Sequence, residues 1–245
     1  MIPWIVHGAA FPPVASALRQ PNGLLAASST SELTAERLVQ AYRVGIFPWY
    51  SEGQPALWWS PDPRMVLYPQ EFHASRSLRK QLRAAERGED FGLHLRADSA
   101  FEQVMRACAA PRNGQDGTWI TEHMIRVYCE LARRDLAHSI EIWHGEQLVG
   151  GLYGICLGRM YFGESMFSRA PSASKIALAT LVGLLRREAV PMIDCQQNSA
   201  HLASLGAREI TRAHFGRQVA EAVQRAPIDW SAYRGVRLNS LLSDH

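Results

Sequence analysis

The chain of 245 residues is 47% hydrophobic and 20% charged, and its formal net charge is +3 at pH 7. This balance is typical of a folded globular protein and excludes an intrinsically disordered chain. The longest largely apolar run, residues 176–185, is too short to span a bilayer, so we expect a soluble, cytoplasmic protein with no membrane partner. The small positive charge would suit a partner that carries phosphates, but it does not identify one.

The cysteines argue against a structural metal site. None of the four is spaced as C-x-x-C, and each lies in an apolar stretch. Such cysteines are typical of buried, reduced thiols in a reducing compartment. We therefore expect no metal.

The first part of the chain differs from the rest. Residues 1–70 hold nine of the thirteen prolines, which predicts loops and turns around a single helix that Thr34 caps and Gly45 ends. From residue 65 onward the apolar residues recur regularly. We therefore expect a small N-terminal domain over residues 1–64 and a larger one over residues 65–245.

The larger domain begins with three predicted helices. Residues 75–86 form a basic helix, Asp98 is expected to cap the second, and Thr121 the third. The apolar period then changes to two, which predicts consecutive antiparallel strands over 138–143, 147–157 and 159–164. A long helix over 172–188, a strand over 192–196 and a short helix capped by Asn198 or Ser199 follow. This order predicts an α+β fold in which antiparallel strands lead into a helix crossover.

Several motifs of known chemistry are absent. The sequence has no phosphate-binding G-x-x-x-x-G-K-[ST] loop, no G-x-G-x-x-G, no G-x-S-x-G and no H-E-x-x-H. The [QR]-x-x-G-x-[GA] loop that binds the coenzyme A pyrophosphate is absent too. An enzyme without these motifs is expected to use a substrate that arrives already activated.

Two predicted strand ends carry polar residues. Glu164 lies among apolar residues, where a carboxylate is costly unless it is paired. It either pairs with Arg169 or another arginine, or it shapes a ligand pocket or meets a cationic substrate. Asp194 and Gln196 alternate and should share one strand face. They either hold an attacking amine and take up its proton, or form a hydrogen-bonded pair that caps the next helix. Cys195 is disfavoured as a nucleophile because no base is evident nearby.

Aromatic and basic residues offer binding surfaces. Trp49, Trp58, Trp59 and Trp119 follow turn residues, so they either line a pocket or pack in the core. One face of the predicted helix 75–86 is either solvated or binds phosphates. Its four basic residues are Arg76, Arg79, Lys80 and Arg83.

Together these segments resemble the bacterial leucyl/phenylalanyl-tRNA–protein transferases. The resemblance spans nearly the whole chain and is most specific at three motifs. These are WWSPDPR (58–64), FGESMFSR (162–169) and DCQ (194–196); PNGLLA (21–26), GIFPWY (45–50), GTWIT (117–121) and HLASLGAREI (201–210) also match.

The resemblance implies an activity and a fold. Such enzymes transfer leucine, phenylalanine or, less readily, methionine from the charged tRNA to proteins that begin with arginine or lysine, marking them for N-end rule degradation. They need no cofactor. The implied fold is a small N-terminal domain joined to an acetyltransferase-like (GNAT-like) domain with a mostly antiparallel sheet flanked by helices. We expect a monomer.

The resemblance also implies roles for residues. Gln196 would hold the acceptor amine and Asp194 would polarise Gln196, while the basic face of helix 75–86 would bind the tRNA backbone. The aminoacyl pocket would be lined by Trp119, Tyr161, Gly163, Glu164 and Met166, with Trp49 beside the terminal adenosine.

Three other functions remain open from the sequence. They are an acyl-coenzyme A-dependent N-acyltransferase of the same fold class, an aminoacyl-tRNA-dependent ligase of cell-wall peptides, and a protein that only binds RNA. The missing pyrophosphate loop argues against the first.

Overall fold

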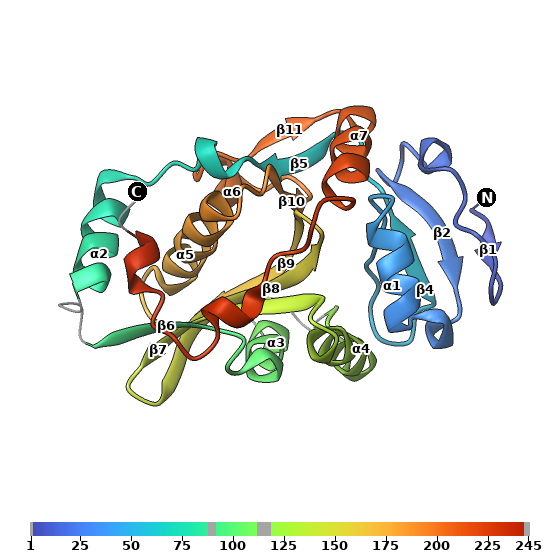
Figure 1. Ribbon diagram of the computed structural model, residues 1–245. Coiled ribbons are helices and arrows are strands. Elements are labelled where there is room, and N and C mark those ends of the chain that lie inside the picture. The colour runs from blue at the N-terminus through green and yellow to red at the C-terminus, as the bar shows by residue number, and fades with distance from the viewer. Residues whose placement is uncertain (1, 88–91, 112–118, 243–245) are drawn as a thin grey trace.

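The computed structural model describes residues 2–87, 92–111 and 119–242, so residues 117–118 of the GTWIT motif lie outside the described residues. The chain forms two sheets with helices around them (Figure 1). The fold is therefore a mixed α and β architecture, as the sequence predicts. Within the described residues, no helix is long and apolar enough to cross a membrane.

The N-terminal sheet is the part that the sequence pattern misses. Its strand order is β1-β2-β4-β3, and helix α1 packs beside it. The bounds are β1 (Trp4–Ile5), β2 (Leu24–Ser28), α1 (Ala35–Tyr42), β3 (Phe47–Pro48) and β4 (Ala56–Trp59). The prediction that loops and turns surround a single helix is wrong, because four strands form here. These strands are too short to show an alternation of apolar and polar residues. The helix is confirmed, and the Thr34 hydroxyl caps it by accepting from the Arg37 amide.

The larger sheet carries the site. Its strand order is β11-β5-β10-β9-β8-β7-β6, and every neighbouring pair is antiparallel except β9 with β10. The bounds are β5 (Arg64–Leu67), β6 (Leu93–Ala97), β7 (Ala137–His144), β8 (Gln147–Leu157), β9 (Met160–Ser168), β10 (Met192–Gln196) and β11 (Arg208–Ile210). The predicted strands at 138–143, 147–157, 159–164 and 192–196 are therefore confirmed.

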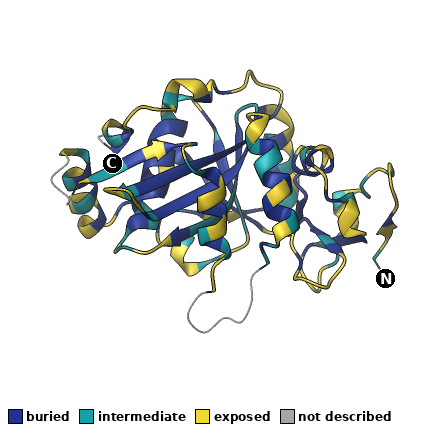
Figure 2. Ribbon diagram, turned by 90° about the horizontal axis from the view of Figure 1, so that it is seen from below, coloured by how far each residue is buried: buried dark blue, intermediate teal, exposed yellow. Residues whose placement is uncertain are grey.

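Helices cover both faces of this sheet (Figure 1). The α5 helix connects the parallel strands β9 and β10 and buries its apolar residues together with those of α2. On the opposite face, α3, α4 and α7 share a hydrophobic cluster that continues into the N-terminal sheet. Figure 2 shows the strands as the buried layer and the helices as exposed on their outer sides. The bounds are α2 (Arg76–Arg87), α3 (Phe101–Ala109), α4 (Glu122–Arg133), α5 (Ala173–Arg187), α6 (Ala200–Ala203) and α7 (Arg212–Ala222), with 3₁₀ turns η1 (Val14–Ser16), η2 (Thr30–Glu32), η3 (Pro69–Glu71), η4 (Trp230–Tyr233) and η5 (Asn239–Leu242).

One predicted helix cap is wrong. Asp98 has a positive φ of 53° and does not cap α3, whose N-cap residue is Ala100. The Asp98 carboxylate instead accepts from the Ser139 backbone amide, 2.8 Å away. The start of α3 is satisfied by Glu141 of β7, which accepts from the backbone amides of Ser99 and Ala100 at 2.9 Å. An acceptor from a neighbouring strand thus replaces the local cap.

Candidate active site

The site lies where strands β9 and β10 separate. They pair in parallel from Met160 opposite Met192 as far as Phe162 opposite Asp194. Beyond that point β9 continues beside β8 and β10 continues beside β5. Gly163 follows directly, and a Cβ atom there would lie 3.3 Å from the Asp194 carbonyl oxygen. Glycine therefore keeps the opening between the strands clear.

A pocket of about 770 Å³ occupies this opening. Most of its wall is apolar, with residues from β8, β9, β10, α5 and α6. Its size and lining are typical of a site for an apolar group held in place by a few polar contacts. Its lining residues include Trp119, Tyr161, Gly163, Glu164, Met166, Leu178, Leu181, Asp194, Cys195 and Asn198.

Asp194 is anchored by an arginine. Both side chains of the Arg64–Asp194 pair are fully buried, and the guanidinium donates from Nε at 2.8 Å and from Nη2 at 2.7 Å. Arg64 also donates to the Gly45 carbonyl oxygen and lies against the ring of Phe215. A two-point ion pair of this kind fixes the position of the carboxylate.

Gln196 sits at an irregularity that Asp194 supports. The register with β5 shifts between Asp194 and Gln196, and Gln196 has a φ of 63°, a region that residues other than glycine rarely occupy. The Gln196 backbone amide donates to Asp194 Oδ1 at 2.9 Å. The contact from Asp194 therefore goes to the backbone, and the expectation that Asp194 polarises the Gln196 side chain is corrected here.

The Gln196 side chain instead meets Glu164. Its Nε2 atom donates to Glu164 Oε1 at 2.8 Å, and the same carboxylate accepts from the hydroxyls of Tyr42 at 2.7 Å and Tyr128 at 3.0 Å. Glu164 thus has neutral donors, and the predicted pairing with Arg169 is wrong, since Arg169 lies over the Phe167 ring. An ionised carboxylate only accepts hydrogen bonds, so the Gln196 amide presents its NH2 group to Glu164. The oxygen of the Gln196 amide is therefore directed away from Glu164.

Burial dominates the protonation of Glu164. Desolvation raises its pKa to about 7, and the nearby Asp194 charge raises it too, while the hydroxyls of Tyr42 and Tyr128 and the Gln196 amide lower it. Glu164 therefore changes charge near neutral pH. Burial also raises the pKa of the Cys195 thiol, which argues against a thiolate nucleophile, as the sequence indicates.

Comparison with known proteins decides the family. Residues 66–220 match the family described as leucyl/phenylalanyl-tRNA protein transferase, and residues 31–62 match the N-terminal domain of the same family. A leucyl/phenylalanyl-tRNA–protein transferase from Paraburkholderia phymatum is 55% identical over 99% of both chains. The chain belongs to the leucyl/phenylalanyl-tRNA–protein transferase family.

Other relatives agree with this membership. The enzyme of the same name from Bordetella bronchiseptica is 53% identical over 95% of this chain and 92% of its own, and that from Burkholderia ambifaria is 56% identical over 94% and 91%. As a member of the leucyl/phenylalanyl-tRNA–protein transferase family the protein is an aminoacyltransferase, which argues against a protein that only binds RNA. The solved structure of L-PGS from Bacillus licheniformis aligns over 73% of this chain and 57% of its own, at 12% identity and a TM-score of 0.39, too low to assign the fold.

The other residues to which the family resemblance assigns a binding role differ in their burial. Trp119 and Met166 line the pocket, whereas Tyr161 is fully buried beneath it and donates its hydroxyl to the His138 carbonyl oxygen. Tyr161 therefore offers a ring to the pocket and no free hydroxyl. Trp49 is not among the described residues that line the pocket; it is 40% exposed and lies against Trp59, with ring centroids 5.5 Å apart.

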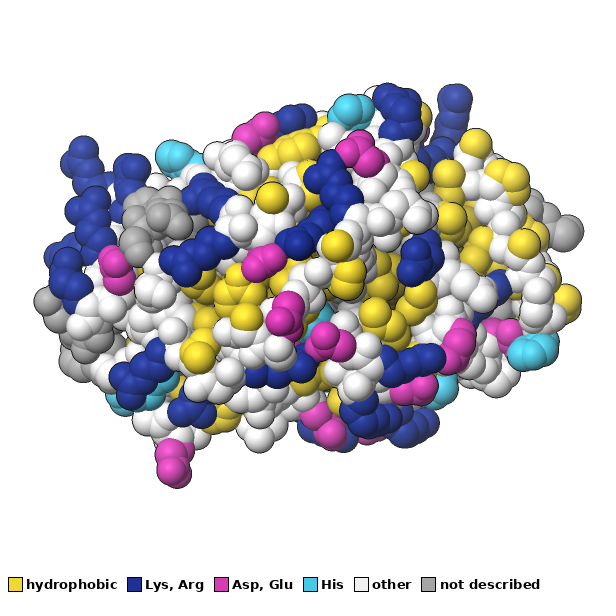
Figure 3. Space-filling model, in the orientation of Figure 1, with side chains coloured by type: hydrophobic (Ala, Val, Ile, Leu, Met, Phe, Trp, Pro, Cys, Tyr) yellow, Lys and Arg dark blue, Asp and Glu magenta, His cyan; other side chains and the backbone are white. Residues whose placement is uncertain are grey.

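The basic helix lies at the opposite end of the molecule from the N-terminal sheet (Figure 1). Lys and Arg side chains gather over α2 in Figure 3. A shallow surface hollow is lined by the four predicted residues Arg76, Arg79, Lys80 and Arg83 together with Arg87. This surface is separate from the pocket.

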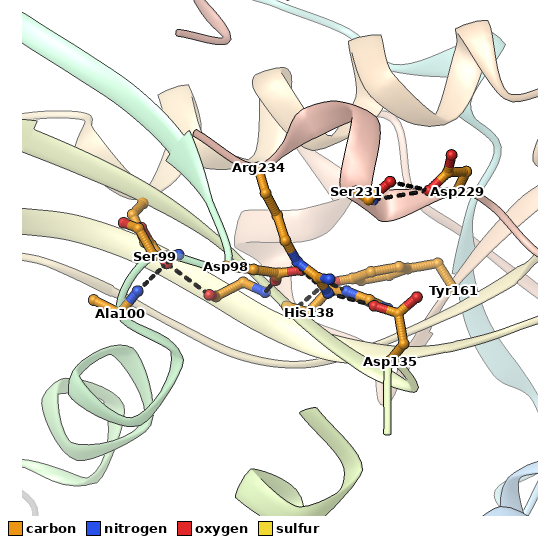
Figure 4. A network of polar contacts seen from close by, with 11 residues as sticks. Asp98, Ser99, Ala100, Asp135, His138, Tyr161, Asp229, Ser231 and Arg234 are labelled. Carbon is orange, nitrogen blue, oxygen red and sulfur yellow. Dashed lines mark hydrogen bonds and ion pairs between the residues drawn. The ribbon is translucent and has the colours of Figure 1, made fainter. Parts of the chain in front are cut away.

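One group of acidic and histidine residues has metal-ligand chemistry. Ligand atoms of Asp98, Asp135 and His138 lie within 4.8 Å of one another. The Arg234 guanidinium lies between the two carboxylates and pairs with both (Figure 4). His138 Nδ1 is already bonded to Asp98, and its ring stacks on Trp230 at 3.9 Å. An arginine cation here takes the place that a metal ion would need.

The sequence pattern does not identify three residues of the site. Tyr42 and Tyr128 lie on the apolar stripes of α1 and α4, and Arg64 begins the fully buried strand β5. Each carries a detectable signal, because a buried tyrosine hydroxyl and a buried guanidinium both require a partner. The apolar pattern of the sequence does not show which acidic residue each of these side chains contacts.

Proposed function

We propose that this protein transfers leucine or phenylalanine, and methionine less readily, from aminoacyl-tRNA to the N-terminal arginine or lysine of acceptor proteins. The observation that supports this most is the Gln196 amide, which is oriented by Glu164, a residue that lines a large pocket with a mostly apolar wall. An apolar pocket accepts such side chains and rejects polar ones through the cost of desolvation. The product proteins would then enter degradation by the N-end rule.

The chemistry needs positioning more than activation. The acceptor nitrogen attacks the ester carbonyl carbon, the new C–N bond forms, and the ester C–O bond breaks. One proton of the attacking nitrogen passes to the ribose oxygen, which leaves as a hydroxyl. Holding ester and amine together can supply roughly 7–11 kcal/mol of the barrier. Only the neutral amine attacks, so the ammonium must first lose its proton to solvent water. The Gln196 oxygen then accepts a hydrogen bond from that amine and aims its lone pair at the carbonyl.

The remaining residues have supporting roles in this proposal. Asp194 holds the Gln196 backbone through the contact at 2.9 Å, and Glu164 orients the amide. Trp119, Tyr161, Gly163 and Met166 shape the aminoacyl pocket, and Trp49 receives the terminal adenosine. The hollow on α2 holds tRNA phosphates and reads little sequence.

The architecture fits this proposal. We propose that residues 65–245 form a GNAT-like catalytic domain and residues 1–64 a small N-terminal domain. The support is the antiparallel run β6 to β9, followed by the α5 crossover to the parallel strand β10. The larger sheet begins at Arg64, one residue before the proposed boundary. We also propose a monomeric, cytoplasmic enzyme without a cofactor.

The test uses tRNA charged with labelled phenylalanine and two peptides that differ only in their first residue. Transfer of label to the peptide that begins with arginine, and not to the one that begins with alanine, is the expected result. Gln196→Ala should lower the transfer rate while the aminoacyl-tRNA still binds. No transfer by the folded, unmodified protein to either peptide would contradict the proposal.

A further inference from the structure

A carboxylate on the rim of the site has no assigned role. Glu209 lies on β11 and is exposed, and the contact that the structure shows for it is with Asn198, whose Nδ2 atom donates to Glu209 Oε1 at 2.9 Å. Asn198 itself lines the pocket. The neighbouring Arg208 is paired with Glu71, and Arg212 donates to the Ser60 carbonyl oxygen. Neither adjacent arginine is therefore placed to neutralise Glu209.

The strand register puts Glu209 in line with Gln196. Met65 of β5 is opposite Gln196 on one side and opposite Glu209 on the other. Residues opposite each other across regularly paired strands project to the same face, so Glu209 lies on the side of Met65, which packs in the cluster under α5, whose Leu178 and Leu181 line the pocket. Gln196 lies beyond the register shift of β10, and its side chain turns to Glu164 instead. Two strand spacings separate the Cα atoms of Gln196 and Glu209 by about 10 Å.

This separation suits a long cationic side chain. An acceptor whose amine lies at Gln196 can send its own side chain along the rim toward Glu209 and keep its charged head in water. Lysine and arginine have stems long enough for this, whereas shorter side chains do not reach. Among the described pocket-lining residues there is no lysine or arginine to repel such a group.

We propose that Glu209 recognises the cationic side chain of the acceptor's first residue, and that Asn198 positions the Glu209 carboxylate. This inference rests on the proposed function and names a residue that selects the acceptor. A guanidinium would pair with the carboxylate through two N–H donors, and an ammonium through one. Glu209 takes no part in the chemical step.

The test compares acceptor peptides that begin with arginine and with citrulline, which has the same shape without the charge. The unmodified protein should favour the arginine peptide in kcat/KM, and Glu209→Gln should reduce that preference by about 2- to 5-fold through the arginine rate alone, since the ion pair is exposed to solvent. Asn198→Ala should reduce it less. Glu146→Gln, an exposed glutamate at the β7–β8 turn, is the matched control and should keep the full preference.

The possible outcomes separate the two claims. Binding of aminoacyl-tRNA should be the same in Glu209→Gln and the unmodified protein, since Glu209 does not touch the donor. Transfer with an arginine-to-citrulline ratio unchanged by Glu209→Gln would overturn this assignment and leave the proposed function standing. No transfer by the unmodified protein would overturn the proposed function and this assignment with it.

Discussion

Two carboxylates on neighbouring strands have opposite surroundings. Asp194 on β10 is fully buried and bound at two points by the Arg64 guanidinium. Glu164 on β9 lines the pocket and is held by the hydroxyls of Tyr42 and Tyr128 and by the Gln196 amide. One acid is neutralised by a cation and the other is not, although both contact the same glutamine.

This difference gives Asp194 a structural role and Glu164 a role in the chemistry. An ion pair with good geometry fixes the Asp194 carboxylate in place, so it secures the backbone of Gln196. Neutral donors only partly offset the desolvation of Glu164, which leaves its pKa at about 7. A group that titrates near neutral pH beside a pocket is typical of a functional site.

Removing Asp194 should have the largest effect. Asp194→Ala leaves Arg64 charged and unpaired inside the protein, so the free energy of unfolding should fall by about 3–5 kcal/mol. Denaturant unfolding followed by circular dichroism measures this. The double variant Arg64→Met with Asp194→Leu is the control and should recover part of the loss, because no buried charge remains. A loss below about 1 kcal/mol in Asp194→Ala would mean that the pair is not buried in solution.

Replacing Glu164 should change how stability depends on pH. The pKa of Glu164 is raised from 4.5 to about 7 in the folded state, so protonated Glu164 favours the folded protein. This contribution to the free energy of unfolding is fully present below pH 4.5 and is lost as the pH rises through about 7. Glu164→Gln cannot ionise. Its free energy of unfolding relative to the unmodified protein should therefore rise by on the order of 2 kcal/mol between pH 5 and pH 8. A constant difference across this range would show that Glu164 titrates normally.

Removing one hydroxyl should have a smaller effect on the same group. Tyr128→Phe takes a donor from the ionised carboxylate, so the pKa of Glu164 should rise further, by about one unit. Titration of Glu164 by carbon-detected NMR reports this shift. Tyr233→Phe is the control, because its hydroxyl bonds to Glu188 outside the pocket. An equal pKa in Tyr128→Phe and the control would remove Tyr128 from the network.

The basic helix should contribute the smallest effect, and only to tRNA binding. Arg79→Gln with Arg83→Gln removes two phosphate contacts, so the slope of log affinity against log salt should become shallower by about 1.5. Arg225→Gln, which removes a side chain paired with Glu221, is the control and should leave the slope unchanged. Equal slopes in both variants would place the tRNA elsewhere.

The parts of the fold that the sequence predicts are those with long, regular periods. The helices at 75–86 and 172–188 and the strands of the 138–164 region extend far enough to show their pattern. The strands of the N-terminal sheet have two to five residues each, which is too few to show alternation. Asp98 has the residue type of a helix cap, yet Ser139 and His138 bind its carboxylate from a distant strand.

The sequence indicates several residues of the site but not the contacts that they make. Asp194, Gln196 and Glu164 stand out as polar residues at strand ends, and the structure brings them together. Alternation places the two β10 residues on one face, but the register shift before Gln196 turns its side chain toward Glu164. Such irregularities and the choice of partner depend on tertiary contacts, which the period of a single strand does not report.

In the proposed reaction, ionised Glu164 orients Gln196 for the acceptor amine, and a pH–rate profile reveals whether the charge of Glu164 has this role. Single-turnover transfer of labelled phenylalanine to a peptide that begins with arginine would be followed from pH 5.5 to pH 9 in the unmodified protein and in Glu164→Gln. The unmodified rate should rise through about 7 and again near the amine pKa of about 8, whereas Glu164→Gln should show only the second rise. Identical profiles in the two proteins would show that the charge of Glu164 does not orient Gln196.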